Sequence, residues 1–194
     1  MSTLVYRRAR VTDIPAMAEV RAQDWGTQSY WRERIAAYLA QERHPRESLL
    51  PRVAFLCKER GRVVGLIAGH LTRRFGCDAE LEWLSVRPRH RNRGIAAELL
   101  RRLFRWFVAH NAVHVCVDVE PSNQPARRFY QRHGARDLRT HWMIWEDVCG
   151  LLHVPQGTGV EGISTPGPDT SPGLARRSGL RASVRLQRSR RRGR

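Results

Sequence analysis

A basic turn between a strand-like and a helix-like segment holds the residues best suited to bind an anion. Arg91 and Arg93 lie in this turn, and after Gly94 the apolar residues recur at helical spacing. The first N–H groups of a helix have no partner within it and carry partial positive charge. Because Gly94 has no side chain, a phosphate can approach the main chain there. The turn is therefore predicted to bind phosphate, with a pyrophosphate as the preferred ligand.

The abundance of arginine allows another interpretation of the same turn. Lys and Arg together number 35, Lys58 is the only lysine, and the net charge is +17. An arginine at any one position is therefore weak evidence for a ligand, and a single glycine between a strand and a helix is often only a turn. The order of the surrounding elements has to decide between the two interpretations.

The elements that must position this turn are predicted from the period of the apolar residues and from turn residues. Strands are expected over residues 4–9, 52–58, 63–71, 77–86, 113–119 and 139–147. Helices are expected over residues 13–22, 28–41 and 94–110, and from residue 122 to just before Gly134. The order β-α-α-β-β-β-α-β-α-β predicts an α+β fold, with a hairpin in the first half and one β-α-β crossover in the second.

Composition divides the chain into a domain, residues 1–149, and a tail, residues 150–194. The tail is rich in Gly, Pro, Ser and Thr and then in Arg, so it has too few apolar side chains to offset the entropy of ordering and is predicted to be disordered. Its last twenty residues contain nine arginines. Nucleic-acid binding through phosphate contacts is therefore an alternative function. A solvated extension is the simpler interpretation.

The cysteines predict a reducing location and no metal site. Cys57, Cys77, Cys116 and Cys149 are far apart and show no zinc-ligand spacing. A cytoplasmic protein fits these thiols best. The chain has no signal-peptide pattern and no run of 18 apolar residues, so neither export nor membrane insertion is expected.

Two motifs resemble the GNAT superfamily of acyl-CoA-dependent N-acetyltransferases. Leu84-Ser85-Val86-x-Pro88-x-x-Arg91-x-x-Gly94-x-Ala96 is similar to its motif A, which reads Arg or Gln, two residues, Gly, one residue, and Gly or Ala. The stretch from Asp118 through Asn123 to Phe129-Tyr130-x-x-x-Gly134-Ala135 resembles its second conserved block. The resemblance follows the element order over residues 4–148 and is sharp over residues 80–135. It implies a mixed central sheet with helices on both faces.

The resemblance implies acetyl-CoA as co-substrate and assigns residues to it. The main chain of Leu84, Ser85 and Val86 should pair with the pantetheine arm as an added strand would. Asn123 should contact the coenzyme where the next strand turns away. The pyrophosphate should lie against the turn and the start of the following helix, at Arg91, Asn92, Arg93, Gly94, Ile95, Ala96 and Ala97.

The implied reaction is direct attack of a primary amine on the thioester in a ternary complex. Tyr130 occupies the position of the tyrosine that protonates the leaving thiolate, and the N–H of Val86 should hold the oxyanion. The amine must lose a proton before it attacks, and Glu80 and Asp118 are the candidate bases. Glu82, two residues along the strand from Glu80, is a weaker candidate. Pairing with an arginine is the structural alternative for each carboxylate.

The acceptor is expected to be an amine of a small molecule or of a peptide or protein. Four aromatic residues could line its pocket or could belong to the core: Trp25, Tyr30, Trp31 and Trp142. A family member that binds coenzyme A without catalysis is a further alternative. The sequence leaves open whether the protein is a monomer or a homodimer.

Overall fold

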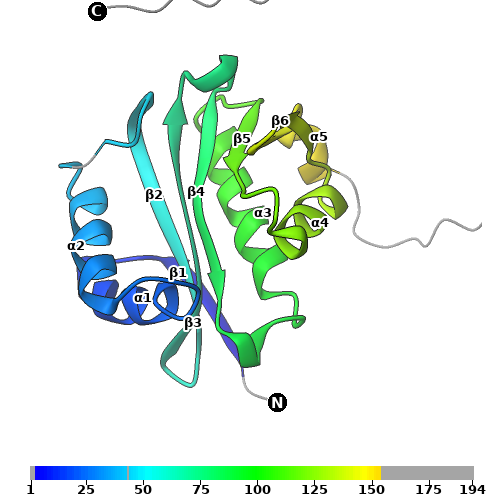
Figure 1. The fold of residues 1–194 in the computed structure, drawn as a ribbon. Helices are drawn as coiled ribbons and strands as arrows, with labels where there is room; N and C mark the ends of the chain where they lie inside the picture. Colours follow the sequence, from blue (N-terminus) through cyan, green and yellow to red (C-terminus); the bar gives the residue numbers. More distant parts are fainter. Residues whose placement is uncertain (1–2, 43, 154–194) are drawn as a thin grey trace, which may run out of the picture. The chain divides into compact units, whose positions relative to one another are not determined.

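The computed structural model describes residues 3–42 and 44–153, which form one mixed sheet covered by helices on both faces (Figure 1). The chain divides into two units, residues 1–157 and 158–194, and the second lies outside the described residues. The predicted α+β fold is confirmed. The predictions made for residues 154–194, disorder and nucleic-acid binding, also fall outside the described part of the chain.

The sheet has seven strands in the order β1-β2-β3-β4-β5-β7-β6. Neighbours are antiparallel except β4 and β5, which are parallel. The strands are β1 (Leu4–Arg8), β2 (Ser48–Glu59), β3 (Arg62–Thr72), β4 (Ala79–Val86), β5 (Val115–Asp118), β6 (Arg136–Arg139) and β7 (Trp142–Trp145). The helices are α1 (Ile14–Arg21), α2 (Gln28–Leu39), α3 (Ile95–Val108), α4 (Gln124–Arg132) and α5 (Val148–His153), with short 3-10 turns η1 (Val11–Asp13), η2 (Arg74–Gly76) and η3 (Pro88–His90).

Two predictions about the end of the domain differ from the structure. The strand expected over residues 139–147 is the shorter β7, and a further strand that was not expected, β6, precedes it and pairs with it across a tight turn. β6 is short, polar and mostly exposed, so it shows no apolar alternation. The helix α5 continues to His153, beyond the predicted domain end at residue 149. It packs back on the domain because Gly134 leaves room: an added Cβ there would lie 2.9 Å from Leu151.

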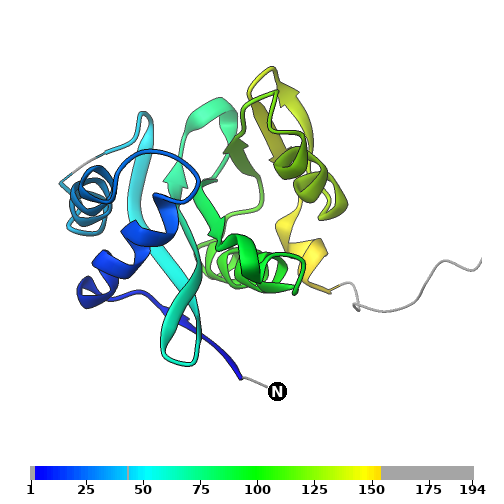
Figure 2. The same ribbon diagram turned by 60° about the horizontal axis from the view of Figure 1, so that its bottom comes forward.

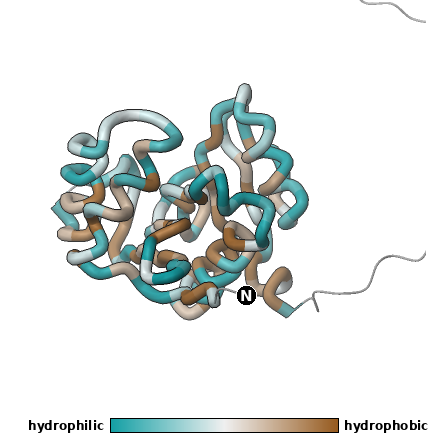
Figure 3. The backbone as a smooth tube through the Cα atoms, turned by 90° about the horizontal axis from the view of Figure 1, so that it is seen from below, coloured by the Kyte–Doolittle hydropathy of each residue, from teal (hydrophilic) through white to brown (hydrophobic). Residues whose placement is uncertain are grey.

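Two apolar clusters fill the spaces between the sheet and its helices. One lies between the sheet and α3, and includes Leu103 and Phe107. The other lies on the opposite face, beneath α1 and α2, and includes Trp31 and Trp83. Figures 2 and 3 show the two helical layers and the hydrophobic segments between them. The apolar residues of α3 recur at helical spacing, so they form one stripe that is buried against the sheet.

Gly69 in β3 lets α3 pack closely on the sheet. An added Cβ at this position would lie 2.7 Å from the Phe107 ring and 2.8 Å from the Glu80 carbonyl oxygen. Glycines inside a strand often mark a bulge or a close main-chain approach. Gly69 marks both, because the β3–β4 register also shifts between Ala68 and Gly69.

The bulge lies at Glu82 of β4, directly after Leu81, the last residue of β4 that pairs with β5. β4 takes two steps from Leu81 to Trp83 while β3 takes one, so Glu82 has no partner residue on β3. Leu81 therefore packs in the α3 cluster and Trp83 in the α1–α2 cluster, although alternation would give both the same face. Beyond Leu81, β4 also has no pairing with β5, which contacts only residues 79–81.

The part of the chain that the structure describes contains no helix that is long and apolar enough to span a membrane.

Candidate active site

A cleft of about 1250 Å³ opens where β4 and β5 separate. Its walls come from the end of α1 and the segment after it, from β4, from the turn before α3, from the end of β5 and from α4. The volume is that of a site for a large ligand. Most of the predicted site residues line it: Leu84, Ser85, Val86, Arg91, Asn92, Gly94, Ile95, Ala96, Ala97, Asp118, Asn123 and Tyr130.

The turn before α3 forms an open cradle of main-chain N–H groups. Gly94 is the N-cap of α3 and has a φ of +75°, in the left-handed region that favours glycine. An added Cβ at Gly94 would meet nothing within 4 Å, so the space above it is open. Among the described residues, no acceptor is bonded to the main-chain N–H groups from Asn92 to Ala97. This arrangement fits a phosphate group.

The two arginines predicted at the turn lie in different places. Arg91 lines the cleft, where it donates to Asp24 at 3.0 Å and to the carbonyl oxygen of Val86 at 3.1 Å. The side chain of Arg93 does not line the cleft, and it donates to Glu59 at 2.6 Å. The main chain of residue 93 nevertheless remains part of the cradle.

The strand edge that lines the cleft carries a buried polar network that the sequence did not indicate. The Ser85 hydroxyl accepts from Arg21 at 2.7 Å and donates to Asp24 at 2.6 Å. Arg21 also lies 4.1 Å from the centre of the Trp31 ring, and burial lowers the pKa of its guanidinium. Arg21 and Asp24 lie more than sixty positions from Ser85 and belong to no recognisable motif, so no local signal identified them.

Tyr130 lies in the wall of the cleft. Its side chain packs edge-on against Trp145, with ring centres 5.4 Å apart, and the residue is 6% exposed. Burial raises the pKa of the phenol well above its usual value of about 10, and the positive charge of Arg21 opposes that shift. The hydroxyl therefore keeps its proton at neutral pH and can donate it.

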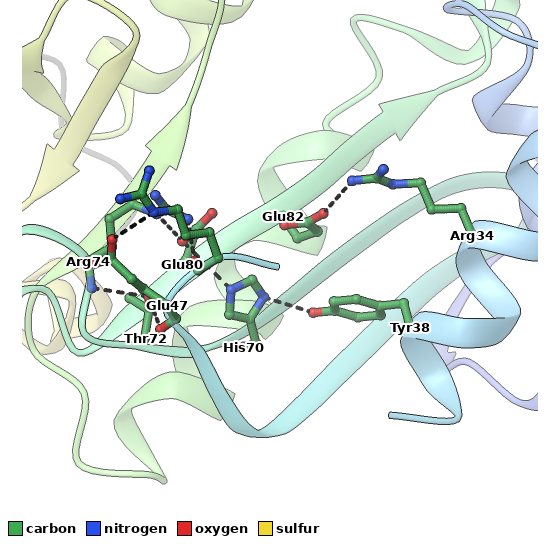
Figure 4. A network of polar contacts seen from close by, with 9 residues as sticks. Arg34, Tyr38, Glu47, His70, Thr72, Arg74, Glu80 and Glu82 are labelled. Atoms are coloured by element: carbon green, nitrogen blue, oxygen red, sulfur yellow. Dashed lines mark hydrogen bonds and ion pairs between the residues drawn. The ribbon is translucent and has the colours of Figure 1, made fainter. Parts of the chain in front are cut away.

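The three candidate bases do not share one environment. Glu80 is buried away from the cleft lining and accepts from Arg74 at 2.9 Å (Figure 4). Glu82 lines the cleft, has a side chain 9% exposed, and lies 3.4 Å from Arg34. Asp118 also lines the cleft and is exposed. Burial raises the pKa of both Glu82 and Asp118.

Both glutamates therefore have the arginine partner that was the structural alternative, and of the two only Glu82 lines the cleft. The sequence could not show which β4 residue the bulge leaves unpaired, because strict alternation treats Glu80 and Glu82 alike.

Asn123 has a structural role as well as a place on the cleft. It is the N-cap of α4, and its side chain accepts from the N–H of Ala126 at 3.3 Å. Of the aromatic candidates for the acceptor pocket, Trp25 lines the cleft, whereas Trp31 is buried in the core. Tyr30 and Trp142 do not line it.

Comparisons with known proteins agree with this geometry. The model of the acetyltransferase (GNAT) family matches residues 15–135. An uncharacterized N-acetyltransferase of Methanocaldococcus jannaschii is 34% identical over 101 residues, which are 52% of this chain and 63% of that protein. The aligned region therefore spans less than two thirds of that relative.

Two solved structures share the fold. The PaiA N-acetyltransferase of Thermoplasma acidophilum, in complex with coenzyme A, aligns with a TM-score of 0.59 and 16% identity over 74% of this chain and 99% of that chain. The aminoglycoside N-acetyltransferase AAC(6′)-Iy, in complex with CoA, aligns with a TM-score of 0.61 and 21% identity over 72% and 91%.

Proposed function

The chain belongs to the GNAT acetyltransferase family, and we propose that it transfers an acetyl group from acetyl-CoA to a primary amine. The observation that carries the proposal is the cleft itself. One cavity holds an open cradle of N–H groups, the part of β4 with which β5 does not pair, and a buried phenol. A phosphate-bearing ligand with an extended amide arm matches the first two features, and a leaving thiol matches the third.

The proposed coenzyme site uses mainly the main chain. The N–H groups of residues 92–97 would hold the pyrophosphate. Residues 84–86 would pair with the pantetheine amides, because β5 leaves that edge of β4 free. Asn123 lies on the same cleft. When bound, acetyl-CoA supplies the thioester that donates the acyl group.

Glu82 is the proposed base. A primary amine is mostly protonated at pH 7, with a pKa of roughly 8–10, so a group in the cleft must accept a proton before the nitrogen attacks. Burial raises the pKa of Glu82, which makes the carboxylate a better proton acceptor. Asp118 is the alternative base on the opposite wall, because it shares both properties, a place on the cleft and a raised pKa.

Tyr130 is the proposed acid. Its hydroxyl retains its proton through the neutral range and would donate it to the departing sulfur. The N–H of Val86 is proposed to hold the oxygen on which negative charge develops.

Cytoplasmic location and an amine as the acceptor stay predictions. The free thiols of Cys57, Cys77 and Cys116, all buried, are consistent with a reducing compartment.

The experiment that tests this function pairs acetyl-CoA with a panel of amines and measures release of free thiol. Coenzyme A binding is measured in parallel by calorimetry on the wild type, Gly94→Glu and Gly76→Glu. Gly76 is a matched control, because it also has a positive φ, +76°, and open space around it, but lies off the cleft. Gly94→Glu should weaken binding more than tenfold and Gly76→Glu should leave it unchanged. Equal affinities in all three proteins, or no binding by the wild type, would refute the proposal.

A further inference from the structure

A cluster of ionisable side chains lies behind the wall of the cleft at Glu82 (Figure 4). His70 from β3 and the two glutamates of β4, Glu80 and Glu82, bring their nitrogen and oxygen atoms within 4.8 Å of one another. Only Glu82 lines the cleft. The other two residues therefore contact the site through Glu82 and cannot touch a ligand there.

His70 is held in place from one side and unpaired on the other. Its ring is fully buried, and Nδ1 lies 3.1 Å from the Tyr38 hydroxyl of α2. The second nitrogen, Nε2, makes no hydrogen bond with a described residue and lies 3.7 Å from Glu80 Oε2. A buried ring nitrogen without a partner is costly, so its position facing two carboxylates calls for a role.

Arginines neutralise the two carboxylates from opposite ends of the cluster. Arg74 from η2 donates to Glu80 at 2.9 Å, and Arg34 from α2 lies 3.4 Å from Glu82. Two carboxylates and an imidazole can also ligate a divalent cation. Here the arginines already supply the balancing positive charge, which makes added metal charge unfavourable.

The groups around Glu82 act on its pKa in opposite directions. Burial is the largest influence and raises the pKa of Glu82. The electrostatic interactions with His70 and Arg34 lower that pKa, and the interaction with Glu80 raises it. Tyr38 of α2 contacts the imidazole, and Arg52 of β2 lies over the Tyr38 ring at 4.7 Å. Arg21 of α1 interacts electrostatically with Glu82, and Asp118 of β5 interacts with Glu80 and Arg74.

We propose that His70 and Glu80 are positioning residues that control the protonation state of Glu82 from behind the cleft, with Tyr38 fixing the imidazole. The inference rests on the proposed function, in which Glu82 is the base that accepts the amine proton. To act as the base, the Glu82 carboxylate must be ionised before the amine binds and must still be able to accept a proton. Opposed charges on either side of it provide that balance.

The test is a titration of the full-length protein, with carbon-13 in the glutamate carboxyl groups, followed by NMR. The Glu82 signal is assigned by its loss in Glu82→Gln. His70→Gln removes the side chain whose electrostatic interaction lowers the Glu82 pKa, so that pKa should rise; Glu80→Gln removes the one whose interaction raises it, so it should fall. Each shift should be about one unit. Glu98→Gln, which breaks a carboxylate–arginine pair on α3 and does not line the cleft, is the matched control and should shift nothing.

Shifts of His70→Gln and Glu80→Gln in the same direction, or no shift in either, would overturn the inference. Because His70 is buried, thermal melting checks that its variant is folded, and Tyr38→Phe provides a second variant that keeps the ring packed on Trp83. Tyr38→Phe should move the Glu82 pKa in the same direction as His70→Gln.

The same variants separate this inference from the proposed function. With an active acceptor, the acid limb of kcat/KM should move to higher pH in His70→Gln and to lower pH in Glu80→Gln. A limb that stays in place in both would overturn the positioning role. A wild type that transfers no acetyl group refutes the proposed function, whereas the titration still decides how Glu82 is controlled.

Discussion

Single residues of the cleft have separable roles, and Tyr130 has the simplest. We expect Tyr130→Phe to lower kcat more than tenfold and to change coenzyme A affinity little, because the substitution removes only the proton donor and keeps the ring against Trp145. Steady-state kinetics and calorimetry on the same preparation measure both quantities. An unchanged kcat would remove the acid role.

The two carboxylates on the cleft are distinguished by the pH dependence of the reaction. A base must be ionised to act, so kcat/KM falls as the pH drops through its pKa, which burial raises for both Glu82 and Asp118. We expect Glu82→Gln to abolish this acid limb together with most of the activity. Asp118→Asn should keep the limb. The reverse result would transfer the base to Asp118.

At this scale the sequence predicted which residues of the basic turn line the cleft better than it predicted which carboxylates do. The glycine and the helix start at Gly94 form a local motif, so their placement on the cleft could be anticipated. The choice between Glu80 and Glu82 depends on a bulge that forms only when β3 pairs with β4. Arg21 and Asp24 reach the cleft from a distant helix end, which no local pattern shows.

Among the elements, the contact of β3 with α3 depends on Gly69. We expect Gly69→Ala to destabilise the fold by roughly 1–3 kcal/mol, because its Cβ would overlap Phe107 and the main chain of β4. Gly65→Ala on the same strand is the control. Its Cβ would lie 3.0 Å from the Ile95 side chain and 3.3 Å from the Ser85 carbonyl oxygen, a milder overlap than at Gly69, so a smaller loss is expected. Urea unfolding compares them, and equal losses would contradict the close-contact argument.

The elements themselves were predicted where apolar periodicity is strong. The helix α3 and the β2–β3 hairpin follow their patterns closely. The strand β6 was missed because its polar residues are mostly exposed. The helix α5 was missed because its six residues are too few to show helical periodicity and lie directly before a composition typical of a tail. Both depend on packing against parts of the chain that local patterns cannot include.

For the whole molecule, the arginine-rich end and the described fold should function independently. We expect removal of residues 154–194 to leave coenzyme A affinity and thiol release unchanged, because every residue lining the cleft lies before residue 134. Any affinity for nucleic acid should disappear with the tail and should fall steeply with salt in the full chain. Loss of coenzyme binding on truncation would show that the tail belongs to the site.

The short pairing between β4 and β5 leaves part of one strand edge inside the seven-stranded sheet without a neighbouring strand. Only three residue pairs join its halves, and residues 82–86 of β4 extend past them. A coenzyme arm laid along that edge would supply the missing hydrogen bonds, so the ligand would serve as an eighth strand. Amide hydrogens of residues 82–86 that face away from β3 should then exchange with deuterium freely in the apo protein and slowly in the complex. The substrate would in this way complete the hydrogen bonding of the sheet.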